Sequence, residues 1–69
     1  MHKYLVIFEK AGSNYSAYSP DIPGCIATGN TRKEAEKNIK EAISLHLEGL
    51  DSDGLPVPEP SSSTEYIEV

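Results

Sequence analysis

The amino-acid sequence predicts an α+β domain with the element order β-β-β-α-β. Three observations support this class: apolar side chains alternate from Tyr4 to Phe8, an apolar stripe at helical spacing runs from Ala35 to Leu50, and residues 65–69 alternate again. Period two is typical of strands, and recurrence every three or four residues is typical of a helix. We therefore expect a single four-stranded mixed sheet in the spatial order 3-2-1-4, with one helix packed on one face.

The first strand is predicted over residues 1–10. Its side chains divide between two faces, and both faces are apolar, which is typical of a strand that is covered on both sides. One face carries Tyr4, Val6 and Phe8, and the other carries Leu5 and Ile7. Because the helix covers only one face of the sheet, we expect the other face to meet a second copy of the chain in a homodimer.

A turn at residues 11–14 leads to a return strand, predicted over residues 15–19. Period two puts Tyr15 and Tyr18 on opposite faces of this strand, so they do not form one patch. Tyrosine is enriched at the centres of protein interfaces, although ordinary sheet packing with the hydroxyl at the rim is the alternative for each one. The candidate interface residues are Tyr4, Val6, Phe8, Tyr15 and Tyr18.

The next segment has the composition of a rigid turn. Pro20 and Pro23 fix their own φ angles near about −65°, and Asp21 is a residue that turns favour. Gly24 can adopt φ > 0 without a steric penalty. The turn leads into a short third strand, predicted over Cys25–Thr28, and three strands with short connections form an antiparallel meander.

The helix is predicted over Arg32–Glu48. Gly29 closes the third strand, and Thr31 and Glu34 fit a capping box, in which the Thr31 hydroxyl accepts from the Glu34 amide and the Glu34 carboxylate accepts from the Thr31 amide. Gly49 is expected to end the helix in the left-handed conformation. The apolar stripe consists of Ala35, Ile39, Ala42, Ile43, His46, Leu47 and Leu50.

Residues 51–64 are rich in proline and serine and predict an extended crossover rather than a disordered tail. Proline at every second position prevents a helix and weakens ladder hydrogen bonding. A last strand is predicted over Glu65–Val69, with Ile67 and Val69 pointing inward, beside the first strand and parallel to it. Residues 1–69 are therefore expected to form a single domain.

Composition limits the classes of function. The formal net charge is −5, which disfavours direct binding to nucleic acid, because phosphate contacts need Lys and Arg. It favours a basic protein partner, although it also simply keeps a small protein soluble. The single cysteine fits a reducing compartment, and the apolar run at residues 4–8 is too short for a signal peptide or a membrane span. We expect a cytoplasmic protein.

The sequence shows no catalytic or metal-binding constellation. Cys25 is interpreted as a buried structural thiol, because its neighbours supply no base that would activate it. His46 is interpreted as a half-buried core residue, and no third ligand at metal spacing accompanies it and His2. Metal-dependent cleavage of RNA needs clustered carboxylates, and the middle of the first strand carries no acid. We therefore predict no enzymatic activity, no cofactor and no metal.

The segment from residue 18 to residue 43 resembles the signature of the HicB-like antitoxin family. It contains Ser-Pro-Asp-Ile-Pro-Gly-Cys, then Gly-Asn-Thr-Arg-Lys-Glu-Ala, then Ile-Lys-Glu-Ala-Ile. The residues that carry the resemblance are Pro20, Asp21, Pro23, Gly24, Cys25, Gly29, Thr31, Glu34 and Ala35. The resemblance implies a truncated ribonuclease-H-like fold and an antitoxin that masks a basic, RNA-cleaving HicA-like toxin.

The sequence departs from the family in one respect, which concerns DNA binding. Many members of the family carry a C-terminal segment that binds DNA, and the sequence through Val69 contains none, so direct DNA binding is not expected. The alternative function is a stand-alone HicB-like module that binds a ligand, or a small enzyme, without a toxin. A tight stoichiometric complex with a basic toxin favours the antitoxin, whereas a bound metabolite or turnover favours the alternative.

Overall fold

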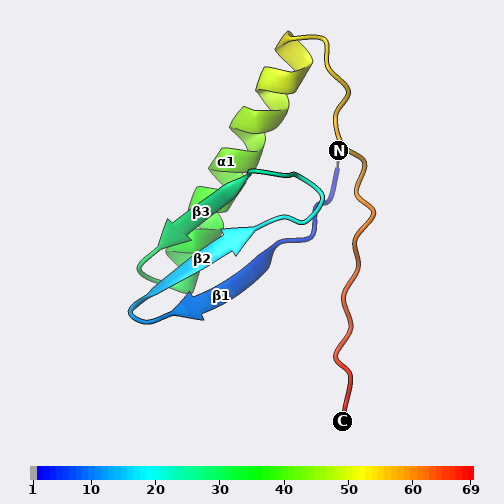
Figure 1. Cartoon of the computed structure of the whole chain (residues 1–69). Coiled ribbons are helices and arrows are strands. Elements are labelled where there is room, and N and C mark those ends of the chain that lie inside the picture. Colours follow the sequence, from blue (N-terminus) through cyan, green and yellow to red (C-terminus); the bar gives the residue numbers. More distant parts are fainter. Residues whose placement is uncertain (1) are drawn as a thin grey trace.

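The computed structural model describes residues 2–69 and places one helix against one face of a three-stranded antiparallel sheet (Figure 1). The strands are β1 (Ile7–Ala11), β2 (Asn14–Tyr18) and β3 (Ile26–Gly29), and they lie in the order β1-β2-β3. The helix α1 spans Arg32–Ser52. The predicted meander, the α+β class and the single helix on one face are therefore confirmed.

The strand register decides which side chains face the helix. Ala17 in the middle of β2 pairs with Phe8 of β1 and with Ala27 of β3. Paired residues of an antiparallel ladder lie on the same face, and Ala17 is fully buried against α1, so this row faces the helix. The next row, Ile7, Tyr18 and Ile26, faces the other side of the sheet.

The core is small and draws on the turn as well as on the regular elements. The buried apolar residues are Ala17, Ile22, Cys25, Ala35 and Ile39. Ile22 reaches the core from the turn between β2 and β3, where its amide donates to the carbonyl of Ser19 and its carbonyl accepts from the amide of Cys25. Gly24 in that turn has φ of +80°, as predicted. The turn therefore shapes the chain and also contributes to packing.

The helix begins where the sequence predicts. Thr31 is the N-cap, and its hydroxyl accepts from the amide of Glu34 at 3.0 Å. The other half of the capping box differs from the prediction, because the Glu34 carboxylate accepts from the amide of Asn30 at 2.9 Å rather than from that of Thr31. Asn30 precedes the N-cap, so this bond ties the incoming chain to the first turn of the helix.

The end of the helix was predicted wrongly. Gly49 lies inside α1, which continues to Ser52, and the left-handed residue is Gly54, with φ of +69°. The amide of Leu55 donates to the carbonyl of Leu50 at 2.8 Å, and the amide of Gly54 donates to that of Asp51 at 3.1 Å. These two bonds form a Schellman motif. A glycine inside a helix costs only about 1 kcal/mol, so Gly49 does not stop the helix before this better cap.

The predicted fourth strand is absent from the described residues 2–69. The segment after Gly54 is extended but pairs with no strand, and Ile67 and Val69, which were expected to point inward, are exposed. Two serines in it are bound to Asp21 at the end of the sheet, and beyond them the chain leaves the body of the molecule (Figure 1). The sheet order 3-2-1-4 is therefore corrected to three strands.

The first strand is shorter than predicted. β1 begins at Ile7, and Met1, where the predicted strand began, lies outside the described residues. The ladder stops where Ile7 pairs with Tyr18, because the residue after Tyr18 enters the turn. Residues 2–6 therefore extend beyond β2 without a strand partner.

Candidate protein interface

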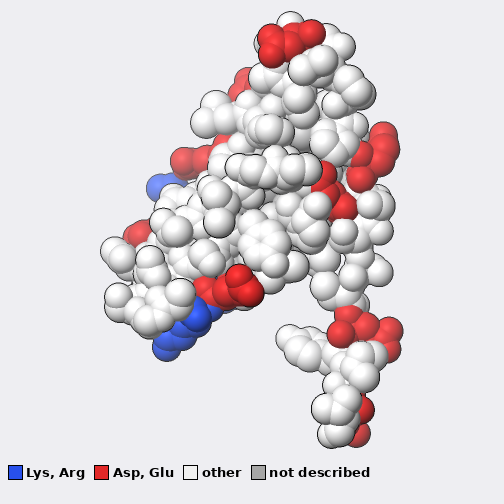
Figure 2. Space-filling model, in the orientation of Figure 1, with Lys and Arg blue, Asp and Glu red and all other residues white. Residues whose placement is uncertain are grey.

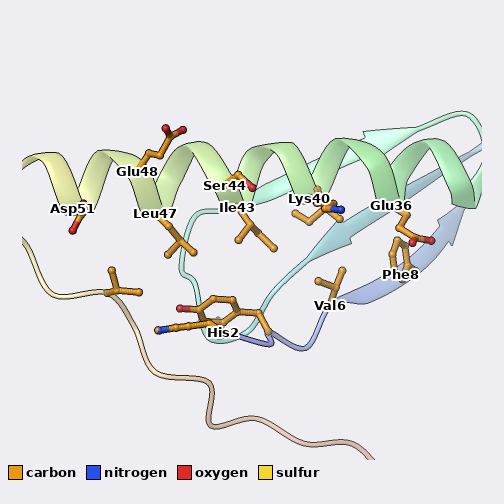
Figure 3. A pocket seen from close by; sticks show the side chains of 13 residues that line it. His2, Val6, Phe8, Glu36, Lys40, Ile43, Ser44, Leu47, Glu48 and Asp51 are labelled. Atoms are coloured by element: carbon orange, nitrogen blue, oxygen red, sulfur yellow. The ribbon is translucent and has the colours of Figure 1, made fainter.

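A groove of about 770 Å³ separates α1 from the first strand and its N-terminal extension; we call it the β1–α1 groove (Figure 3). It forms because α1 packs mainly on β3 and β2, which leaves the helix-facing side of β1 only partly covered. In Figure 3, Ile43 and Leu47 point from α1 toward the side of Val6 and His2. The apolar lining consists of Tyr4, Val6, Phe8, Ile39, Ile43, Leu47 and Val57.

The rim of the β1–α1 groove is polar. It consists of His2, Glu36, Lys40, Ser44, Glu48 and Asp51. The cation of Arg32, near the Phe8 end, lies 4.1 Å from the centre of the Phe8 ring, a distance at which cation and ring attract. An apolar centre with a polar rim is the usual composition of a protein interface.

The sheet face that α1 does not cover is apolar at one end. Ile7, Tyr18 and Ile26 lie side by side there, and Ile26 is 64% exposed. The next row, Glu9, Ser16 and Thr28, is polar. We call the first row the open-face row. It lies at the same end of the sheet as the turn between β2 and β3.

The structure separates the five residues that the sequence singled out for an interface. Tyr4, Val6 and Phe8 meet in the β1–α1 groove, whereas Tyr15 packs against the core and does not line it. Tyr18 lies on the opposite face, in the open-face row. Sequence reasoning missed Ile26, an exposed neighbour of Tyr18. The alternation of side chains along the third strand, combined with a register for the meander, would have revealed it. The role of the five predicted residues in an interface stays a prediction.

Asp21 from the signature segment holds the C-terminal segment in place. Its carboxylate accepts four hydrogen bonds, from the amides and the hydroxyls of Ser61 and Ser62, at 2.8–3.2 Å. These bonds, led by the one from the Ser62 hydroxyl, lower the pKa of Asp21 below its ordinary value. Nearby, the Tyr4 hydroxyl donates to the carbonyl of Pro58. We call these contacts the tail latch.

Charge is distributed unevenly along the chain. All six Lys and Arg residues lie at or before Lys40. Residues 41–69 contain no Lys or Arg and carry the acids Glu41, Glu48, Asp51, Asp53, Glu59, Glu65 and Glu68. Figure 2 shows acidic side chains at the far end of α1 and along the C-terminal segment, and basic ones toward the hairpin end of the sheet. One end of the molecule is therefore suited to a basic partner.

The described residues offer little for reaction chemistry. Cys25 is buried, as predicted, and burial raises the pKa of its thiol, which disfavours the reactive thiolate. His46, predicted to be half-buried, is exposed, although it shares a helix face with the buried Ala35. Within residues 2–69, no three His, Cys, Asp or Glu side chains gather as metal ligands. The same residues contain no helix with the length and apolar character of a membrane span.

Comparison with protein families decides which group the chain belongs to. The family described as "HicB_like antitoxin of bacterial toxin-antitoxin system" matches residues 4–69. The chain belongs to the HicB-like antitoxin family. The resemblance carried by the turn and the helix cap is therefore confirmed, and members of this family are typically not enzymes.

Relatives of several kinds are similar to this HicB-like chain. An uncharacterised 14.9 kDa protein of Haemophilus phage HP1 is 41% identical over 64 residues, which cover 93% of the chain and 48% of that protein. A UPF0150 protein of Synechocystis is 40% identical over 86% of the chain and 76% of its own length. Antitoxin HicB 2 of Photorhabdus laumondii is 31% identical over 97% of the chain and 49% of its length. The chain thus spans about half the length of the first and third of these relatives.

A solved structure supports the same assignment. A chain of a "HicA3 and HicB3 toxin-antitoxin complex" superposes with a TM-score of 0.72 at 37% sequence identity. The similarity covers 87% of this HicB-like chain and 70% of the other chain. The fold described above is therefore one found in a toxin-antitoxin assembly.

Proposed function

We propose that this HicB-like chain is an antitoxin module that binds and masks a HicA-like, RNA-cleaving toxin. The observation that carries the proposal is the similarity, at 37% identity, to a chain of a HicA3 and HicB3 complex. Membership of the antitoxin family over residues 4–69 supports the same function. The action proposed is stoichiometric binding, without catalysis, a cofactor, nucleic acid or a membrane as partner.

The charge distribution supports a basic protein as the partner. The acidic side chains of residues 41–69 occupy the far end of α1 and the C-terminal segment, and no Lys or Arg offsets them there. Opposite charges accelerate association over distances of about 8 Å at physiological ionic strength. A protein that binds RNA carries Lys and Arg for its phosphate contacts, so such a toxin is complementary to this end of the molecule.

Two further parts of the proposal concern assembly and location. We propose that the chain forms a homodimer, because the β1–α1 groove and the open-face row leave apolar side chains partly uncovered in one copy. An interface that buries about 800 Å² on each partner is typical of a specific complex. We also propose a cytoplasmic site of action, where an RNA-cleaving toxin meets its substrate and where the thiol of Cys25 stays reduced.

The experiment combines the purified chain with the protein encoded by the adjacent reading frame, which the proposal expects to be a basic, RNA-cleaving toxin. RNA cleavage by that protein should fall to zero at a fixed molar ratio of the two, and the association rate should fall as salt is added. Glu48→Lys at the acidic end should slow association several-fold, whereas Glu9→Lys, the same change on the uncovered sheet face, should not. If cleavage continues at excess of the chain, the antitoxin function is wrong. Mg²⁺-dependent cleavage of RNA by the chain alone would favour the enzyme alternative.

A further inference from the structure

The outer edge of β1 is free in the described part of the chain. β1 pairs with β2 on one side, and no strand among residues 2–69 pairs with it on the other. The backbone amides and carbonyls that point outward from an edge strand form a template for another strand. The β1–α1 groove lies directly beneath this edge, because Val6 and Phe8, which line it, lie on β1 and its extension.

The same chain carries an unpaired segment with the pattern of a strand. The C-terminal segment is extended (Figure 1), and the order Glu65, Tyr66, Ile67, Glu68, Val69 would place Ile67 and Val69 on one side of a strand. Tyr66 and Val69 are fully exposed, and Ile67 is 71% exposed. Three large apolar side chains within four residues are thus exposed to solvent, and exposed apolar clusters of this kind mark interaction sites.

The tail latch directs this segment away from its own sheet. The bonds from Ser61 and Ser62 to Asp21 hold the chain at the end of the sheet where β2 passes into the turn. Only one residue lies between Ser62 and the strand-like segment. Figure 1 shows that the chain then runs outward from the body, with its end far from the outer edge of β1.

We propose that residues 64–69 of one copy add as a fourth strand to the outer edge of β1 in a second copy. The exchange is reciprocal, since each copy supplies one strand and one edge, and such self-complementary contacts close with twofold symmetry. This proposal rests on the homodimer proposed above and specifies how its two copies join.

The pleat of the added strand explains why it fits. Ile67 and Val69 lie on one side of the segment, and Tyr66 and Glu68 lie on the other. With Ile67 and Val69 turned toward α1, these two side chains fill the β1–α1 groove of the second copy. Tyr66 then lies beside Ile7 at the end of the open-face row, and Glu68 stays in solvent.

Charge favours this pairing as well. The stretch that contains the free edge, residues 2–10, carries two cations and one acid, Lys3, Lys10 and Glu9, whereas the added segment carries only acids, Glu65 and Glu68. Opposite charges on neighbouring strands stabilise a sheet. A second copy is therefore a better occupant of the edge than an unrelated strand, because the sequence supplies both complementary halves.

Light scattering at tens of micromolar protein provides the first test. The wild-type chain should have twice the chain mass. The double variant Ile67→Asp with Val69→Asp should have the mass of one chain, because carboxylates do not enter an apolar groove. Leu45→Asp is the matched control, since Leu45 is an exposed apolar residue outside the β1–α1 groove, and it should remain dimeric.

Cross-linking provides the second test. One tagged copy carries Ile67→Cys and a second, differently tagged copy carries Ser44→Cys, which places a thiol at the rim of the groove. A short bifunctional thiol reagent should join the two tags, and wild-type protein, with only the buried Cys25, should give the background. A single chain that carries both substitutions should also cross-link mainly between copies.

Each result has a distinct meaning. A monomeric wild type overturns both the homodimer and the exchange, but it leaves toxin binding untouched. A dimer that survives the double variant overturns the exchange alone. Cross-links confined to single chains also overturn it, because the segment then closes on its own edge. If the wild type is monomeric and the double variant no longer binds the toxin, the edge belongs to the toxin instead.

Discussion

Replacing Gly29 by alanine tests how closely α1 packs on β3. A Cβ atom at this position overlaps the backbone nitrogen of Ala35 and lies 2.8 Å from the carbonyl carbon of Glu34. Non-bonded heavy atoms attract best at about 3.5–4.0 Å, so the first turn of α1 must move away by about 1 Å. The three nearest atoms belong to the backbone, and therefore no change of rotamer relieves the overlap.

The expected cost follows from two opposing effects. Overpacking of this kind costs about 1–3 kcal/mol, and alanine offsets about 0.4–1 kcal/mol of it by restricting the unfolded chain. The free energy of unfolding of Gly29→Ala should therefore fall by about 1–2 kcal/mol. A chain of this length has a free energy of unfolding of about 3–10 kcal/mol, so the loss is a large fraction of its total stability. The same loss should lower the Tm by about 5–15 °C.

Urea unfolding, followed by far-ultraviolet circular dichroism, measures this loss. The protomer concentration is kept constant, because self-association changes the apparent stability. Gly49→Ala is the matched control: Gly49 lies inside α1 with no atom within 4 Å of the added Cβ, so this variant should gain about 0.5–1 kcal/mol. Equal midpoints for Gly29→Ala and wild type would refute the close packing, and an equal loss in both variants would show that the overlap is not the cause.

Three other predictions follow from single contacts. Thr31→Ala should lower the free energy of unfolding by about 1 kcal/mol, because it removes the acceptor for the Glu34 amide, and Thr31→Ser should recover most of it in the same titration. The buried hydroxyl of Ser19 has no hydrogen-bond partner in the described part of the chain, so Ser19→Ala should be neutral or should stabilise by up to about 1 kcal/mol; a clear loss in urea unfolding would contradict this. The tail latch should be intact from neutral pH down to about pH 4 and should be lost as the pH falls through the lowered folded-state pKa of Asp21. A pH titration of the Ser62 amide by NMR checks this, and a midpoint at or above 3.8, the ordinary value, contradicts it.

Local interactions explain why much of the fold was predicted from the sequence. The turn at Asp21–Gly24 and the cap at Thr31 depend on residues within a few positions of one another, so their conformations follow from residue type alone. Family membership was recognised from the same local residues. Periodicity located the first three strands and α1, although the end of α1 was wrongly predicted at Gly49, and the helix continues to Ser52.

The arrangement of partners in space was decided only by the tertiary structure. Alternation of Ile67 and Val69 predicted a fourth strand beside the first, but residues 65–69 pair with no strand among residues 2–69, because pairing depends on contacts distant in the sequence. The bonds between Asp21 and Ser62 join residues 41 positions apart, and no periodicity reveals them. The amino-acid sequence thus determined the turns, the cap, the class and the family, since these follow from neighbouring residues. The tertiary structure decided the free edge of β1 and the β1–α1 groove beside it, since these depend on how α1 lies across the sheet.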